Sequence, residues 1–270
     1  MRTHSLLLIN PRSGDDSPSA EEIAEAARTH GVEPHLLEKA EDPGEVARAS
    51  GAEILGIAGG DGSLAAVAGA ALDTGAAFVC VPFGTRNHFA RDVGLDRDDP
   101  LAALAAFTEG VERRIDVGRV GERFFLNNVS LGVYAGLVHR REHGRRRGEA
   151  LARLRALATV TRHRHTLHAT VNDEPVRARV IFVGNNCYEL SLFTVGERER
   201  LDAGELFLWT AEGVLPSAWE QRTGRSFTID TRGARVRAAV DGEPVVLESP
   251  VELESLPGAL RLLLPPRGED

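Results

Sequence analysis

Lysine is almost absent from this 270-residue chain, although arginine is common. The only lysine is Lys39, in the polar segment LLEKAEDPGE. A Walker A phosphate loop, the strand lysine of protein kinases and a Schiff-base mechanism each require a lysine in a defined motif. The sequence therefore predicts that the protein uses none of these three devices.

Cysteine and long apolar runs are also scarce. The two cysteines, Cys80 and Cys187, lack metal-ligand spacing and suggest no disulfide, which is typical of a reducing compartment. No apolar run reaches the roughly 18 residues that a membrane span needs, and the opening HSLLLINP does not have the layout of a signal peptide. We expect a soluble, cytoplasmic protein.

The chain is acidic, with a net charge of −8, but its charge is uneven. Nine arginines and only two glutamates lie between Arg140 and Arg164. The overall charge predicts no nucleic-acid partner. The basic segment, which we expect to be helical over about 135–162, predicts attachment to an anionic membrane surface; a solvated helix or the contact of a homodimer are the alternatives.

Short apolar runs alternate with helical patterns over residues 1–115. The runs SLLLIN, EILGIAGG and AAFVCVPFG are nearly continuous, as in strands of a parallel sheet that is covered on both faces. Each is followed by a polar, glycine-containing turn: NPRSG (10–14), GGDGS (59–63) and PFGTRNHFARD (82–92). Ligands of such sheets bind at the carboxyl ends of the strands, so these turns together predict a binding site.

The pattern changes from about residue 116 to many short strands. The segments VNDEPV and VDGEPV are typical of tight hairpin turns between alternating strands. We therefore predict an α/β domain with a parallel sheet over 1–115 and a β-rich, antiparallel, sandwich-like domain over 116–257. The segment GALRLLLPP (258–266) predicts one more strand, either of the second domain or returning to the first.

The order of these motifs carries a resemblance to a known family. NPRSG, GGDGS, GTRNHFARD, RIDVG (114–118) and a late DGE (241–243) resemble the diacylglycerol kinase catalytic-domain family, which includes bacterial lipid kinases and sphingosine kinases and is distantly related to NAD kinases. The resemblance implies ATP and Mg²⁺ as cofactors and a cleft between the two domains as the site. Without lysine, the phosphate charge must be compensated by Mg²⁺ and by arginine, for which Arg12 and Arg86 are candidates.

The resemblance also implies roles for individual residues. It places Asp61 beside the transferred phosphate, and it implies that Asp116, Asp241 and Glu243 organise the magnesium or the acceptor, with Asp116 and Asp241 as metal ligands. The general base is Asp61 or Glu243, and the sequence leaves both open. The candidate nucleotide-binding residues are Asn10, Arg12, Gly59, Gly60, Gly62, Ser63, Thr85 and Asn87.

Three positions depart from the family pattern. Ser63 replaces a common threonine and keeps a hydroxyl, whereas His88 stands where aspartate is frequent. In RLDAGELFL the acid is Asp202 and the expected position holds Ala203, so we do not predict the structural metal that some family members bind there.

The sequence leaves the phosphoryl acceptor open. The favoured prediction is an ATP-dependent lipid kinase that acts on diacylglycerol or another lipid alcohol and takes part in phospholipid metabolism. The alternatives are a kinase of a soluble acceptor, similar to an NAD kinase, and an inactive nucleotide- or lipid-binding homologue. An apolar slot for the lipid would be lined from the second domain by Leu131, Val133, Tyr134, Leu137 and Phe193.

Overall fold

The computed structural model describes residues 3–14, 18–84, 87–132, 166–188, 190–191, 194–195, 198–212 and 219–266. The predicted basic helix over 135–162 lies outside them, as do Thr85 and Arg86. The chain divides into two compact units: unit 1 comprises residues 1–115 and 258–270, and unit 2 comprises residues 116–257. No helix among the described residues is both long enough and apolar enough to cross a membrane.

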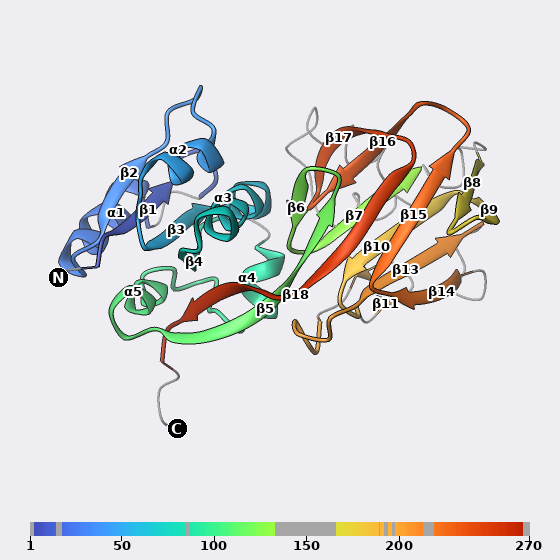
Figure 1. The fold of residues 1–270 in the computed structure, drawn as a ribbon. Coiled ribbons are helices and arrows are strands. Elements are labelled where there is room, and N and C mark those ends of the chain that lie inside the picture. Colours follow the sequence, from blue (N-terminus) through green and yellow to red (C-terminus); the bar gives the residue numbers. More distant parts are fainter. Residues whose placement is uncertain are drawn as a thin grey trace. The chain divides into compact units, whose positions relative to one another are not determined.

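Unit 1 contains the predicted parallel sheet. Strands β1 (Ser5–Ile9), β2 (Glu33–Leu36), β3 (Ile54–Gly59) and β4 (Ala77–Pro82) pair in the order β2-β1-β3-β4 (Figure 1). All of these pairings are parallel. The residues of β1 and β4 are buried throughout, which explains their nearly continuous apolar sequences.

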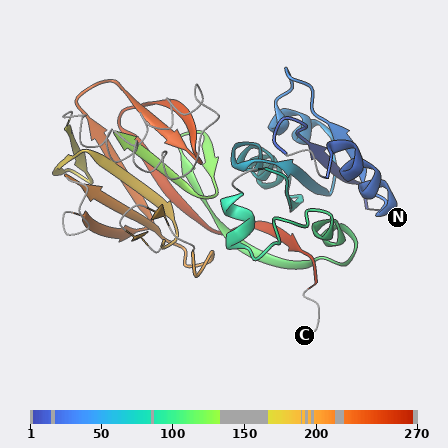
Figure 2. The ribbon, with the colours of Figure 1, turned by 180° about the vertical axis from the view of Figure 1, so that it is seen from behind.

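Helices cover both faces of this sheet, and Figure 2 shows them from behind. One face packs on α1 and on the segment that contains η1 and α5, through side chains such as Leu7 and Val79. Side chains alternate across a strand, so Leu55 and Ile57 of β3 point to the face of the sheet opposite the one on which Gly56 lies against Phe107. The helices of unit 1 are α1 (Ala20–Thr29), α2 (Pro43–Ala49), α3 (Asp61–Thr74), α4 (His88–Asp92), the 3-10 helix η1 (Ala102–Ala105) and α5 (Ala106–Glu109).

Local sequence signals determine where these helices begin and end. Ser19 and Glu22 form a reciprocal capping box at the start of α1, and the Asp42 side chain caps α2. Gly75 ends α3 in the left-handed region with φ of 74°. Gly60 precedes α3 in an extended conformation and supplies no side-chain cap.

Unit 2 is built from antiparallel strands. A six-stranded sheet has the order β14-β13-β10-β7-β16-β17, and β15, β8 and β9 belong to the other large sheet. Both predicted hairpin turns are confirmed, because Asn172 and Asp173 join β8 to β9, Asp241 and Gly242 join β16 to β17, and all four residues have positive φ. The strands are β6 (Arg123–Phe125), β7 (Asn128–Gly132), β8 (Leu167–Val171), β9 (Glu174–Ala178), β10 (Val180–Asn185), β11 (Leu190–Ser191), β12 (Thr194–Val195), β13 (Leu206–Ala211), β14 (Trp219–Gly224), β15 (Ser226–Thr231), β16 (Arg235–Val240) and β17 (Glu243–Glu248).

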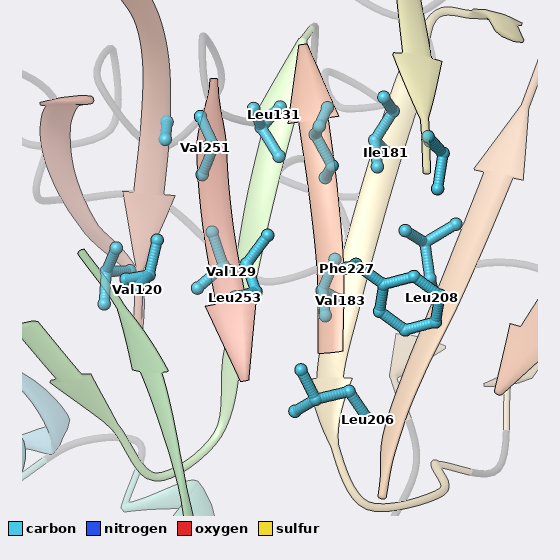
Figure 3. Packing of buried hydrophobic residues seen from close by; sticks show 14 of the residues in the cluster. Val120, Val129, Leu131, Ile181, Val183, Leu206, Leu208, Phe227, Val251 and Leu253 are labelled. Carbon is cyan, nitrogen blue, oxygen red and sulfur yellow. The ribbon is translucent and has the colours of Figure 1, made fainter. Parts of the chain in front are cut away.

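The core of unit 2 lies between its sheets. Figure 3 shows side chains of β7, β10 and β13, such as Val129, Ile181 and Leu208, facing Phe227 of β15 and Leu253 of β18 (Val251–Leu264). All five side chains are at least 96% buried. This packing gives unit 2 an apolar interior of its own, and along β15 exposed polar residues alternate with the buried ones.

Two long strands belong to both units. β5 spans Val111–Val120, and β18 spans Val251–Leu264. In unit 1, Leu262 and Leu263 of β18 pair in parallel with β4, whereas the start of β18 pairs antiparallel with β15 in unit 2. The predicted final strand at 258–266 is therefore the second half of a longer strand, and this half joins the parallel sheet of unit 1.

Candidate functional site

The segment GGDGS forms the junction between β3 and α3. Gly59 ends β3, Gly60 is the N-cap, and Asp61 is the first residue of the helix. The first N–H groups of any helix have no partner within the helix, and here the capping residue has no side chain to bind them. Together with the positive end of the helix dipole, these N–H groups suit an anion such as phosphate.

The loops after β1, β3 and β4 approach one another so closely that glycine is required. A Cβ atom on Gly84 would lie 3.2 Å from the Cα atom of Gly60. A Cβ atom on Gly14 would lie 2.0 Å from the Phe83 ring. The three predicted turns therefore meet at one edge of the sheet, and their glycines leave the backbone accessible to a ligand.

Asn10 and Ser63 connect two of these loops. The Asn10 Nδ2 group donates to Ser63 Oγ over 3.2 Å, and the Asn10 Oδ1 atom accepts from the backbone N–H of Arg12 over 3.2 Å. The backbone N–H of Asn10 also donates to the carbonyl oxygen of Ala58 in β3. The side chain of Arg12 is exposed, so its predicted contact with phosphate stays a prediction.

Asp61 is the acidic group of this loop cluster, and its side chain is half-buried. Its Oδ1 atom accepts a long hydrogen bond of 3.5 Å from the backbone N–H of Phe89, at the start of α4. Burial raises the pKa of the nearby Cys80 thiol, and the negative charge of Asp61 raises it further. Asp61 is thus a carboxylate with little hydrogen bonding among the described residues, beside the glycine loops.

Asn87 is held in an unusual conformation next to Asp61. Its φ and ψ are 38° and 53°, in the left-handed region, and its side chain is 1% exposed. The Nδ2 group donates to the carbonyl oxygen of Gly84 over 2.9 Å, while the Oδ1 atom has no hydrogen-bond partner within the described part of the chain. A buried acceptor in this state is ready to bind a donor group of a ligand.

The acids of unit 2 have a different environment. The carboxylate of Asp241, 7% exposed, accepts backbone N–H groups of Leu126, Asn127 and Asn128 at 2.7, 2.8 and 2.9 Å. Its φ of 47° is the left-handed conformation that the hairpin turn requires. Asp241 therefore fixes the turn between β6 and β7, in addition to any role toward magnesium, which stays a prediction.

Asp116 and Glu243 lie at strand positions of the same unit. Asp116 is 2% exposed, and its Oδ2 atom accepts the backbone N–H of Gly204 over 2.6 Å. Its own carbonyl oxygen accepts from the side chain of Asn185 over 2.9 Å. Glu243 is the exposed first residue of β17, opposite Val240. The catalytic roles predicted for both acids stay predictions.

Sequence reasoning missed a buried polar cluster that supports these acids. It contains Asn127, Asn185, Asn186 and Arg198, each at most 4% exposed. Two asparagine pairs, NN at 127–128 and NN at 185–186, stand at the ends of apolar strands and are the signal in the sequence that could have revealed it. Arg198 sits in the charged run GERER, and that pattern gives no sign that one arginine is buried.

The residues fit a nucleotide more clearly than they define a metal site. The backbone N–H groups of the glycine loops and of the helix N-terminus can donate to phosphate oxygens. The buried Asn87 Oδ1 atom can accept from a hydroxyl or amino group of a ligand. Within the described residues, no group of three or more His, Cys, Asp or Glu side chains is arranged to hold a metal ion. Asp61 is the carboxylate of unit 1 that could contact a phosphate-bound cation.

Comparisons with known proteins agree on the family. Residues 4–120 match the model of the diacylglycerol kinase catalytic domain. A diacylglycerol kinase of Bacillus subtilis is 36% identical over 89 residues, which are 32% of this chain and 29% of that protein. "Probable lipid kinase YegS" of Salmonella heidelberg is 27% identical over 97% of this chain and 96% of its own length.

The fold is also that of solved structures. A crystal structure of a diacylglycerol kinase from Bacillus anthracis superposes with a TM-score of 0.72 and 18% identity, covering 97% of both chains. The matched domain model contains the NPRSG, GGDGS and GTRNHFARD loops that meet in unit 1, as well as the RIDVG motif. On these grounds residues 4–120 of the chain are assigned to the diacylglycerol kinase catalytic-domain family.

Proposed function

We propose that the protein is an ATP-dependent kinase that transfers the γ-phosphoryl group of ATP to the hydroxyl group of a lipid alcohol, with diacylglycerol as the first acceptor to test. The observation that carries this proposal is the meeting of three glycine-containing loops around Asp61 at the start of α3. Family membership and the full-length similarity to a protein named as a lipid kinase support the lipid acceptor.

Backbone groups would bind the phosphates in this proposal. The N–H groups of the first turn of α3 have no side-chain cap, and the space beside the backbone of Gly60 is open, since a Cβ atom there would meet nothing closer than Ser13 Oγ at 4.0 Å. Asn10 and Ser63, which already bind each other, would orient the nucleotide with their amide and hydroxyl groups. Such a cradle needs no lysine in the loops.

Asp61 would accept the proton of the attacking hydroxyl group. Its carboxylate has one long hydrogen bond among the described residues, so its oxygens are available to a substrate hydroxyl. Asp241, in contrast, already accepts three backbone N–H groups. Magnesium bound with the nucleotide would neutralise the phosphate charge, as in other phosphoryl transfers.

The test measures phosphate transfer from labelled ATP to diacylglycerol in mixed micelles. The micelles contain anionic lipid because residues 140–164 are strongly basic. The native protein is compared with Asp61→Asn, and Asp73→Asn serves as the matched control because Asp73 lies at the exposed end of the same helix.

We expect Asp61→Asn to lower the turnover number by about 100-fold or more, whereas Asp73→Asn should stay within about threefold of the native rate. ATP binding, measured by calorimetry, should persist in both variants. If the native protein binds ATP and phosphorylates a soluble alcohol such as NAD but not diacylglycerol, the lipid acceptor is wrong. If it phosphorylates neither, the proposed activity is wrong.

A further inference from the structure

Arg198 is a buried cation in unit 2. It is 4% exposed, although arginine is normally among the most exposed residue types. Its Nη1 atom donates to the carbonyl oxygens of Leu126 and Asn185 at 2.6 and 3.1 Å, and its Nη2 atom donates to Asn127 Oδ1 at 3.0 Å. The guanidinium also lies 5.1 Å from the centre of the Tyr188 ring. Arg198 therefore binds oxygens from two separate segments of the chain.

The first of these segments is the turn between β6 and β7, which is bound from two sides. Its N–H groups donate to the carboxylate of Asp241, and its carbonyl and side-chain oxygens accept from Arg198. The peptide group that joins Leu126 to Asn127 thus lies between a buried anion and a buried cation. Both charges orient this peptide dipole in the same sense, so the two reinforce each other in a region of low dielectric.

The second segment connects Arg198 to Asp116. The carbonyl oxygen of Asn185 accepts from Arg198, and the Nδ2 group of Asn185 donates to the carbonyl oxygens of Asp116 and Leu126 at 2.9 and 3.2 Å. One guanidinium therefore binds both the turn whose N–H groups donate to Asp241 and the backbone of Asn185, whose side-chain amide donates to the carbonyl oxygen of Asp116.

We propose that Arg198 is a positioning residue for the kinase reaction, which fixes Asp116 and the hairpin of Asp241 and Glu243 relative to each other. This inference rests on the proposed function, because those acids are the ones that the family resemblance assigns to the reaction. Arg198 acts through the turn at 126–128 and through Asn185, both of which it binds directly.

The planar shape of the guanidinium is essential to this role. Two of its nitrogens reach three oxygens that belong to three residues, whereas a lysine ammonium is a single point of charge. Arg198→Lys keeps the charge and loses part of the geometry. It should therefore have a rate between those of the native protein and Arg198→Ala, which would separate geometry from charge.

The kinetic test compares Arg198→Ala and Arg198→Lys with the native protein. Arg222→Ala is the control, because Arg222 is another arginine of unit 2 and forms an ion pair with Glu174 at 2.8 Å. We expect Arg198→Ala to lower the turnover number by about 30-fold or more, because small displacements of reacting groups are costly. The KM for ATP should change little, since the proposed nucleotide-binding side chains belong to unit 1 and Arg198 belongs to unit 2. Methylguanidinium should restore part of the turnover of Arg198→Ala and leave Arg222→Ala unchanged.

A second measurement does not depend on activity. Amide hydrogen exchange of residues 126–128 should become at least about tenfold faster in Arg198→Ala, because the turn loses its bonds on the carbonyl side. Unchanged exchange, or turnover within threefold of native with no methylguanidinium effect, overturns the inference. If the native protein phosphorylates no lipid while exchange in Arg198→Ala rises as expected, the proposed function has failed, and the structural part of the inference, that Arg198 holds the turn at 126–128, stands.

Discussion

Units 1 and 2 use the same two residue types, glycine and aspartate, in opposite ways. In unit 1, Asp61 stands among glycines and receives one hydrogen bond of 3.5 Å from the described residues. In unit 2, Asp241 precedes Gly242 and receives three backbone N–H groups within 2.9 Å. A glycine beside an acid therefore marks an accessible carboxylate in one unit and a carboxylate that organises the fold in the other.

The difference follows from the neighbouring backbone. The turn of Asp241 and Gly242 folds back beside the turn at 126–128, whose three backbone N–H groups donate to the carboxylate of Asp241. The loop of Asp61 instead begins a helix, and among the described residues its carboxylate accepts one long hydrogen bond, from the backbone N–H of Phe89. Substitutions of the two acids should therefore separate stability from activity.

The largest expected effect on stability is that of Asp241→Asn. Asparagine tolerates the left-handed φ of 47°, so the substitution tests the carboxylate and leaves the turn conformation possible. One acceptor oxygen becomes an amide group that faces backbone donors in a buried site. We expect the free energy of unfolding to fall by about 2–4 kcal/mol and the melting temperature to fall by on the order of 10 °C.

Asp173→Asn is the matched control for this substitution. Asp173 occupies the other tight hairpin, also with positive φ, but its side chain is exposed. Its change should leave the free energy of unfolding within about 0.5 kcal/mol of native in a denaturant titration. Equal losses in both variants would mean that the turn type matters and the three hydrogen bonds of Asp241 do not.

Much of the fold could be predicted from patterns that act locally. The apolar runs of unit 1 become parallel strands because they are buried on both faces, and both hairpin turns follow from residues that tolerate positive φ. The glycine loops could be placed together because the carboxyl ends of parallel strands share one edge. These features depend on a few neighbouring residues, which a sequence displays directly.

The polar cluster of unit 2 could not be predicted in this way. The bond from Leu126 to Asp241 joins residues 115 positions apart, and the bond from Arg198 to Leu126 joins residues 72 apart. The charged run around Arg198 is typical of a solvated surface, and its burial results from tertiary packing. The length of β18 was also missed, because Pro257 and Gly258 interrupt its pattern while the strand continues through both.

Ser63→Ala should have a moderate effect, confined to nucleotide binding. The substitution removes the acceptor that Asn10 Nδ2 uses at 3.2 Å, so the first loop is no longer tied to α3. A lost hydrogen bond of about 1 kcal/mol corresponds to a rise of about fivefold in the KM for ATP. Steady-state kinetics would show this rise with stability nearly unchanged. Thr74→Ala removes a hydroxyl from the other end of α3 and should leave the KM for ATP at its native value.

The smallest expected effect is on the labelling rate of Cys80, a buried thiol of β4 whose pKa is raised in part by the charge of Asp61. Cys187→Ser leaves Cys80 as the single thiol, and burial is the principal cause of its raised pKa, ahead of the charge of Asp61. A thiol must be deprotonated and accessible to react, so labelling of Cys80 requires unit 1 to open whether or not Asp61 is charged. Adding Asp61→Asn should therefore change the labelling rate at pH 8 by less than about threefold. A much faster rate would mean that Asp61 stabilises unit 1 as Asp241 is expected to stabilise unit 2, and the contrast between the two acids would be lost.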